Sequence, residues 1–210
     1  LRGHYEALQA ARSAQGCAPR SELLAADEAA ALPIALGERL LYEERREEPA
    51  TRLRRGLPHE LALKLVALRR DGLEFDASFD GRPLAAPWTQ DRAGNIGLPG
   101  DAAGLVGWSR LLRRPLELGD VLSGSLQGPG GGGRVRGQVI AIGVQAATGR
   151  SFDAAVIELF GEVPHGRVSA RLDGVMVVDR KSGTLLRLEL KSANPDYAMR
   201  RLLTRVEPAS

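Results

Sequence analysis

The chain has 210 residues, of which 43% are hydrophobic, 26% charged and only 4% aromatic, so any buried core must rest mainly on aliphatic side chains. The formal net charge is only +3, and cations and anions are interleaved, which does not favour a nucleic-acid-binding surface. The single cysteine, Cys17, excludes an intrachain disulfide and a cysteine-based zinc site, and no apolar run is long enough to span a bilayer as a helix.

Residues 1–36 are expected to form a helical extension. Apolar residues recur at helical spacing near the start, and Ser21 can cap a short helix over residues 22–31 that ends before Pro33. Because the chain begins at Leu1 rather than Met, we expect a processed form from which a signal peptide has been removed.

The hydrophobic period changes to two at Gly37, which predicts that residues 37–210 form an antiparallel β domain. Residues 59–68 and 73–80 both alternate between apolar and polar side chains, as strands with one solvated face do. The Asp71-Gly72 pair between them is typical of a hairpin turn.

The middle of the chain is rich in proline and glycine and predicts less regular structure. A turn signal covers Asp91 to Asn95, and a short helix is expected between residues 102 and 114, ending before Pro115. The tetrad Gly130–Gly133 predicts a flexible hairpin loop.

The second half predicts a meander of antiparallel strands. In the hairpin over residues 173–193, the turn ends at Gly183, which can adopt a positive φ, and Leu188 faces inward with the leucines two residues to either side. In the last strand, Leu202, Thr204 and Val206 are expected to face inward. A predicted partner-binding surface then consists of the outward cations Arg187, Arg201 and Arg205.

Three kinds of chemistry have only partial signals. Ser109 lies in a Gly-Trp-Ser-Arg sequence that begins like a nucleophile elbow but lacks its second glycine. Glu74, Asp76 and Asp80 share the polar face of one strand and could bind a hard cation, but calcium-loop spacing is absent. The glycine tetrad leads into a strand, whereas a phosphate loop leads into a helix. No catalytic residue, metal site or cofactor is therefore predicted.

Arginine clusters keep a polyanion-binding alternative open. Acidic runs at residues 43–44 and 47–48 interrupt the positive field, and aromatic side chains for base stacking are not interleaved with the cations. The clusters are Arg52, Arg54 and Arg55; Arg110, Arg113 and Arg114; and Arg200, Arg201 and Arg205.

The order of elements resembles the exported bacterial half-barrel proteins, the group that contains the outer-membrane lipoprotein carriers and many uncharacterised relatives. The resembling segments are GERLLYEE as an opening strand, DRAGN as a mid-chain turn and SARLDGVMVVDRKSGTLLRLELKSA as the closing meander. The resemblance covers roughly residues 37–207. It implies a periplasmic or envelope setting and no catalytic residue.

These observations predict a mainly β protein, a bent antiparallel meander or half-barrel with one or two helices. The predicted function is that of a non-enzymatic cell-envelope protein that binds an apolar small molecule or a protein partner. An apolar hollow inside the curved sheet would be lined by Trp88, Trp108, Phe75 and Tyr42. The alternatives are a basic scaffold that binds nucleic acid or another polyanion, and a serine hydrolase that uses Ser109.

Overall fold

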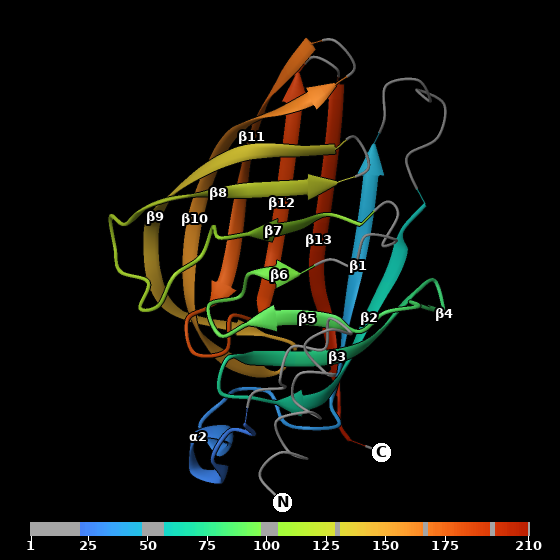
Figure 1. Ribbon diagram of the computed structural model, residues 1–210, viewed down its shortest axis with the longest axis vertical. Helices are drawn as coiled ribbons and strands as arrows, with labels where there is room; N and C mark the ends of the chain where they lie inside the picture. The colour runs from blue at the N-terminus through green and yellow to red at the C-terminus, as the bar shows by residue number, and fades with distance from the viewer. Residues whose placement is uncertain are drawn as a thin grey trace, which may run out of the picture.

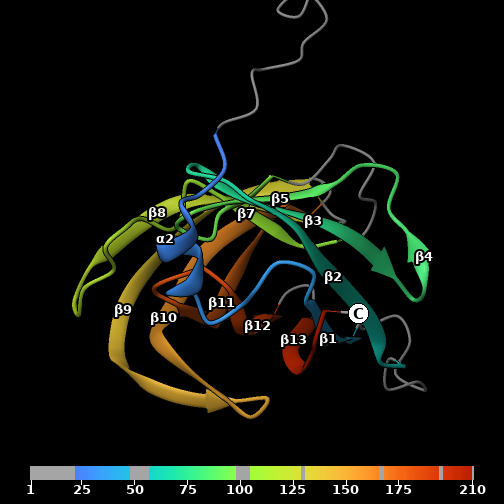
Figure 2. The same ribbon diagram turned by 90° about the horizontal axis from the view of Figure 1, so that it is seen from below.

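The computed structural model describes residues 22–47, 57–97, 105–128, 131–165, 168–193 and 196–209. Within these ranges, thirteen antiparallel strands form one sheet in the order β6-β5-β3-β2-β1-β13-β12-β11-β10-β9-β8-β7, with β4 beside β3. The sheet curls until β6 and β7, at the two ends of this order, come into contact. Figures 1 and 2 show the resulting nearly closed barrel, so the predicted mainly β, half-barrel fold is confirmed.

The longest strands, β9 and β10, lie in the second half of the chain. In chain order the elements are α2 (Ala26–Ala30), β1 (Arg39–Glu47), β2 (His59–Leu68), β3 (Gly72–Phe79), β4 (Arg82–Pro83), β5 (Trp88–Asp91), β6 (Ile96–Gly97), β7 (Gly107–Ser109), β8 (Val121–Gly128), β9 (Gly131–Ala147), β10 (Arg150–His165), β11 (Val168–Asp179), β12 (Leu185–Ala193) and β13 (Asp196–Glu207).

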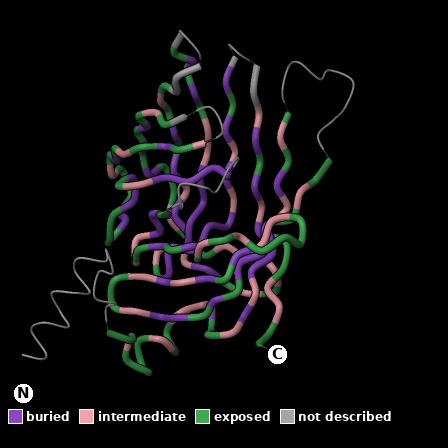
Figure 3. Tube along the Cα trace, turned by 45° about the vertical axis from the view of Figure 1, so that its right-hand side comes forward, coloured by how far each residue is buried: buried purple, intermediate pink, exposed green. Residues whose placement is uncertain are grey.

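The hairpins predicted from alternation are present with the predicted faces. Strands β2 and β3 pair on either side of the Asp71-Gly72 turn, with their apolar side chains buried. Strands β11 and β12 pair across a turn in which Gly183 has a φ of +71°. Figure 3 shows buried and exposed positions alternating along the strands, as expected for a sheet with one face on a core.

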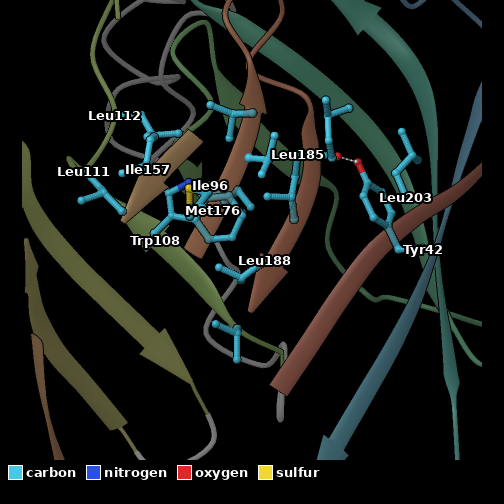
Figure 4. Packing of buried hydrophobic residues seen from close by; sticks show 14 of the residues in the cluster. Tyr42, Ile96, Trp108, Leu111, Leu112, Ile157, Met176, Leu185, Leu188 and Leu203 are labelled. Atoms are coloured by element: carbon cyan, nitrogen blue, oxygen red, sulfur yellow. Dashed lines mark hydrogen bonds between the residues drawn. The ribbon is translucent and has the colours of Figure 1, made fainter. Parts of the chain in front are cut away.

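The hydrophobic core fills the inside of the barrel. Trp108, Met176 and Ile157 pack together there with Leu188 beside them, as Figure 4 shows, and each is at most 1% exposed. Burial of one such side chain contributes roughly 1.5–3 kcal/mol, so this interior is the main source of stability.

Two predictions for the middle of the chain are wrong. The described residues 105–120 contain the short strand β7 and irregular backbone but no helix. The Gly130–Gly133 segment is largely strand, because Gly131 pairs with Gly128 and Gly132 with Gln127. Only residues 129 and 130 of this hairpin lie outside the described ranges, so most of the predicted loop extends β9.

The N-terminal extension is described only from residue 22 onward. Its helix, α2, spans Ala26–Ala30, which is shorter than the predicted 22–31, and its N-cap Ala25 makes no side-chain capping bond. Ser21, the predicted cap, and the earlier predicted helix lie outside the described residues.

The predicted faces of β13 are wrong over its centre because the pairing with β1 contains an irregularity. Leu41 pairs with Arg205 but Tyr42 pairs with Leu203, so Thr204 is an extra residue and the alternation reverses there. As a result Leu203 is buried and Thr204 exposed, and Arg201 points into the barrel with 1% of its surface exposed.

Candidate functional site

The turn between β5 and β6 is closed by the carboxylate of Asp91. Asp91 Oδ1 accepts hydrogen bonds from the backbone amides of Ala93, Gly94 and Asn95, each at 2.9 Å. In such Asx-type bonding, the side chain holds the turn through the turn's own backbone amides, so hydrogen bonds to a neighbouring strand are not required. The turn therefore presents the side chain of Arg92 from a rigid backbone.

The side chain of Asn95 attaches the irregular segment after β7 to this turn. Asn95 Oδ1 accepts from the backbone amides of Leu111 and Leu112 at 2.8 Å, and Nδ2 donates to the Leu112 carbonyl at 2.8 Å. Trp108 Nε1 also donates to the Gly94 carbonyl at 2.8 Å. These bonds satisfy backbone groups that have no strand partner, and they hold Arg114 beside the turn.

The β11–β12 turn packs directly against the same turn. Gly94 has a φ of +103°, and a Cβ added to it would lie 2.7 Å from the Gly183 carbonyl oxygen. Gln90 Nε2 donates to the Ser182 carbonyl at 3.1 Å, and Ser182 in turn donates from N and Oγ to Asp179 Oδ2 at 2.7 Å. The two turns thus touch backbone to backbone, which brings Lys181 close to the β5–β6 turn.

A hollow of about 660 Å³ lies where these turns meet the α2 segment, at the end of the barrel where Figure 1 shows α2. We call it the basic hollow. It is lined by the cations Arg70, Arg92, Arg114 and Lys181, by Glu28, and by Leu24, Ala25, Ala31 and Leu32. A smaller hollow of about 380 Å³ shares Arg114 and Lys181 with it and is otherwise lined by Pro115, Leu116, Asp153 and Arg180.

Three of the cations in the basic hollow form no ion pair within the part of the chain that the structure describes. Arg70 pairs with Glu22 at 3.1 Å, and in the neighbouring hollow Arg180 pairs with Asp153 at 3.2 Å. Among the described residues, no ion pair or hydrogen bond engages the side chains of Arg92, Arg114 or Lys181. Arg92 lies in the β5–β6 turn, Lys181 in the β11–β12 turn, and Arg114 in the segment that Asn95 attaches to them. The rigid scaffold therefore gathers more positive than negative charge, because the described lining holds four cations and one carboxylate, Glu28.

Arg92 shows the electrostatic cost of this arrangement. Burial lowers the pKa of its guanidinium, and the like charge of Arg114 lowers it further, while Glu28 raises it in part. Arg92 Nη1 is buried and has no hydrogen-bond partner among the described residues. An unsatisfied donor on a charged group is unfavourable, and a bound anion would remove the penalty.

The four predicted ligand-binding residues lie in the core rather than around the basic hollow. Trp88, Trp108 and Phe75 are each 1% exposed and Tyr42 is 3% exposed. Tyr42 donates its hydroxyl to the Leu185 carbonyl at 3.0 Å (Figure 4), and burial raises the pKa of that hydroxyl. Tyr42 also borders a separate hollow of about 450 Å³ near His59. Their predicted role in ligand binding stays a prediction.

The three arginines predicted to share an outer surface do not share one. Arg201 is buried, where it forms an ion pair with Glu44 at 2.6 Å and donates to the Val106 carbonyl at 3.0 Å. Arg187 and Arg205 do reach the surface, where each pairs with a glutamate two residues ahead at 2.8 Å. A partner-binding role for these two stays a prediction.

The residues considered for other chemistry are dispersed or already engaged. Ser109 is half-buried in β7 opposite Ser125, and the side chains of two of the three histidines lie outside the described residues. The third, His59, pairs with Asp80 at 2.7 Å. Glu74 lies 3.3 Å from Arg69. The described part of the chain contains no group of three or more potential metal ligands.

The sequence indicates some residues of the basic hollow individually but does not predict that they lie together. The DRAGN turn was identified as a turn, and Arg114 was assigned to a basic cluster, but no local pattern places Arg92, Arg114 and Lys181 together. The cluster Arg52, Arg54 and Arg55 lies outside the described residues. Within the residues that the structure describes, no helix has the length and hydropathy needed to cross a membrane.

Comparison with known proteins identifies the fold. No protein-family model and no curated protein sequence matches the chain. A protein described as exported, with a YmcC-like fold, from Bacteroides fragilis NCTC 9343 superposes with a TM-score of 0.52 at 12% identity, covering 84% of this chain and 98% of that chain.

Two further solved structures align at lower TM-scores. A protein described as a lipoprotein from Parabacteroides distasonis ATCC 8503 gives 0.46 at 11% identity, over 84% of this chain and 97% of that chain. The hypothetical lipoprotein YmcC from Escherichia coli K12 gives 0.33 at 12% identity, over 88% of both chains. The Bacteroides protein shows that the chain shares a fold with a protein described as exported, so the predicted resemblance is confirmed at the level of fold.

Proposed function

We propose that this chain is a non-enzymatic binding protein of the bacterial cell envelope, and that it binds an anionic partner in the basic hollow. The observation that carries the proposal is the convergence of Arg92, Arg114 and Lys181, none of them ion-paired with a described residue, on turns that fix one another. The envelope setting is supported by the fold that the chain shares with the Bacteroides protein described as exported.

The packing of the barrel interior supports placing the site at the hollow. The four residues predicted to line an apolar cavity are at most 3% exposed and belong to one continuous hydrophobic cluster. An apolar ligand at that position would have to displace well-packed side chains, which costs on the order of 1–3 kcal/mol for each added group that the core must accommodate. The basic hollow requires no such displacement.

The lining of the hollow supports binding rather than catalysis. Its described lining residues offer guanidinium and ammonium groups together with Glu28, and include no serine, cysteine or histidine. Arginine stays protonated under physiological conditions and therefore serves as a fixed donor of hydrogen bonds rather than as a general base.

The test is retention on an immobilised heparin column, a polyanionic matrix, during elution with a salt gradient. The variant Arg92→Gln with Arg114→Gln removes two charges from the hollow, and we expect it to elute at clearly lower salt than the wild-type chain.

The matched control, Arg136→Gln with Arg171→Gln, removes the same charge from exposed positions on the barrel wall. We expect a much smaller change in elution for it. Equal shifts for the two double variants would contradict the proposal, because retention would then depend on net charge rather than on the hollow.

A further inference from the structure

We infer, resting on the proposed function, that the anion in the basic hollow is an amphiphile whose head is a phosphate monoester and whose apolar part lies against the α2 segment. Two features of the lining point to this ligand class. The first is the excess of positive over negative charge, and the second is the group of apolar residues in the same lining.

The charge of the hollow matches a dianion. Four cations line it, and two carboxylates are near them, Glu28 in the lining and Glu22 paired with Arg70. Two positive charges remain, which is more than a monocarboxylate or a phosphodiester would neutralise. A phosphate monoester carries roughly −1.5 to −2 at pH 7 and presents three oxygens that accept hydrogen bonds.

The donors in the hollow suit phosphate oxygens. Arg92 and Arg114 line the same hollow, and the charge of Arg114 adds to burial in lowering the pKa of Arg92, so a single anion between them would relieve their repulsion. Guanidinium groups bind phosphate through paired N–H donors, and lysine binds it as a point charge. The buried Arg92 Nη1, which lacks a partner among the described residues, is a donor that such an oxygen would satisfy.

Part of the lining of the same hollow is apolar. Leu24, Ala25, Ala31 and Leu32 line it, and they come from the segments that flank α2, a helix in which no residue is buried. Leu24 and Leu32 pack partly against the core and are not covered by it. A hydrocarbon chain attached to the phosphate could cover these apolar side chains, whereas inorganic phosphate would leave them exposed.

The experiment is isothermal titration calorimetry of the full chain with three ligands, with the two lipids kept below their critical micelle concentrations. The three ligands are dihexanoyl phosphatidic acid, dihexanoyl phosphatidylglycerol and inorganic phosphate. We expect the phosphatidic acid to bind at least tenfold more tightly than the other two. Phosphatidylglycerol has the same acyl chains but a phosphodiester head, so its affinity tests the need for the monoester charge. Inorganic phosphate has no acyl chains, so its affinity tests the contribution of the apolar part.

Two further measurements locate the contacts. Arg92→Gln should weaken phosphatidic acid binding at least tenfold, and the exposed control Arg136→Gln should leave it unchanged. A second series uses the wild-type protein and lengthens the acyl chains of the phosphatidic acid from four to eight carbons. Affinity should rise by up to about fourfold for each methylene that becomes buried, and no mutation that endangers folding is needed.

The outcomes separate this inference from the proposed function. Equal affinities for inorganic phosphate and phosphatidic acid, with no dependence on chain length, would overturn the amphiphile and indicate a soluble phosphate ligand. Absence of binding to all three, with heparin retention still dependent on Arg92 and Arg114, would overturn the phosphate head and leave the anion-binding function standing. Loss of both results would overturn both proposals.

Discussion

Replacing Gly183 by alanine tests whether the two touching turns support the candidate site. Gly183 has a φ of +71°, where a non-glycine residue costs roughly 1–2 kcal/mol. Its added Cβ would also lie 2.5 Å from Gly94 N and 2.6 Å from Gly94 Cα, both rigid backbone atoms. Overpacking of this kind costs about 1–3 kcal/mol, so Gly183→Ala should destabilise the fold by about 2–4 kcal/mol once the smaller entropy of the unfolded variant is allowed for.

The control for this variant is Gly149→Ala. Gly149 has a φ of +76°, but among the described residues other than its two chain neighbours no atom lies within 4 Å of an added Cβ, so it carries the backbone cost without the collision. Urea unfolding followed by tryptophan fluorescence should show a loss of about 1 kcal/mol for Gly149→Ala. If the two variants lost the same stability, the contact between the turns would contribute nothing and the proposed scaffold of the hollow would be wrong.

Three further variants test separate parts of the structure. Leu188→Asp places a charge in the core and should cost roughly 3 kcal/mol or more in urea unfolding, whereas Lys191→Gln at an exposed position of the same strand should cost under about 0.5 kcal/mol; equal losses would invalidate the assigned faces of β12. Glu44→Gln leaves Arg201 buried without its carboxylate and should cost about 3–5 kcal/mol at pH 7 in the same assay; a loss under 1 kcal/mol would show that the buried pair contributes little. Asn95→Ala removes the acceptor for two backbone amides and should both lower the thermal midpoint and weaken heparin retention, and unchanged retention would show that Arg114 does not need this anchor.

The buried ion pair also predicts how stability depends on pH. Burial alone would raise the pKa of Glu44, but the charges of Arg201 and Arg46 outweigh it and hold that pKa below its usual value. A carboxyl with a lowered pKa in the fold contributes stability above its unfolded pKa, about 4.3, and loses that contribution as pH falls through the folded value. Below pH 4.3 the wild-type chain should therefore lose stability more steeply than Glu44→Gln, and parallel curves from urea unfolding between pH 3 and 7 would contradict this.

The sequence predicted most of the regular sheet because its signals are local. Alternation and a single Asp-Gly pair were enough to place the β2–β3 hairpin, and the leucines of β12 were placed on the correct face. The same rule failed in β13 because an extra residue at Thr204, set by pairing with a strand far away in sequence, reverses the alternation. A period-two pattern cannot reveal such a shift.

The candidate site could not be predicted because it is assembled from turns rather than from a motif. Arg92 and Lys181 are 89 positions apart, and the contact that joins their turns is a backbone approach between Gly94 and Gly183. The local sequence around each glycine is typical of an ordinary turn and does not indicate this contact. The two tryptophans were predicted to bind a ligand because they lie in an irregular segment. Trp108 instead packs inward and donates its indole N–H to the Gly94 carbonyl, which supports the β5–β6 turn.

The most direct test of the account is to map the bound anion by amide chemical shifts in two-dimensional NMR of the isotope-labelled chain, titrated with dihexanoyl phosphatidic acid. The account predicts that the largest shifts fall on residues 91–95, residues 111–116 and residues 179–183 and on the α2 segment, and that they vanish in the Arg92→Gln, Arg114→Gln variant. Shifts concentrated around Trp88, Phe75 and Tyr42 inside the barrel, and retained in that variant, would contradict it.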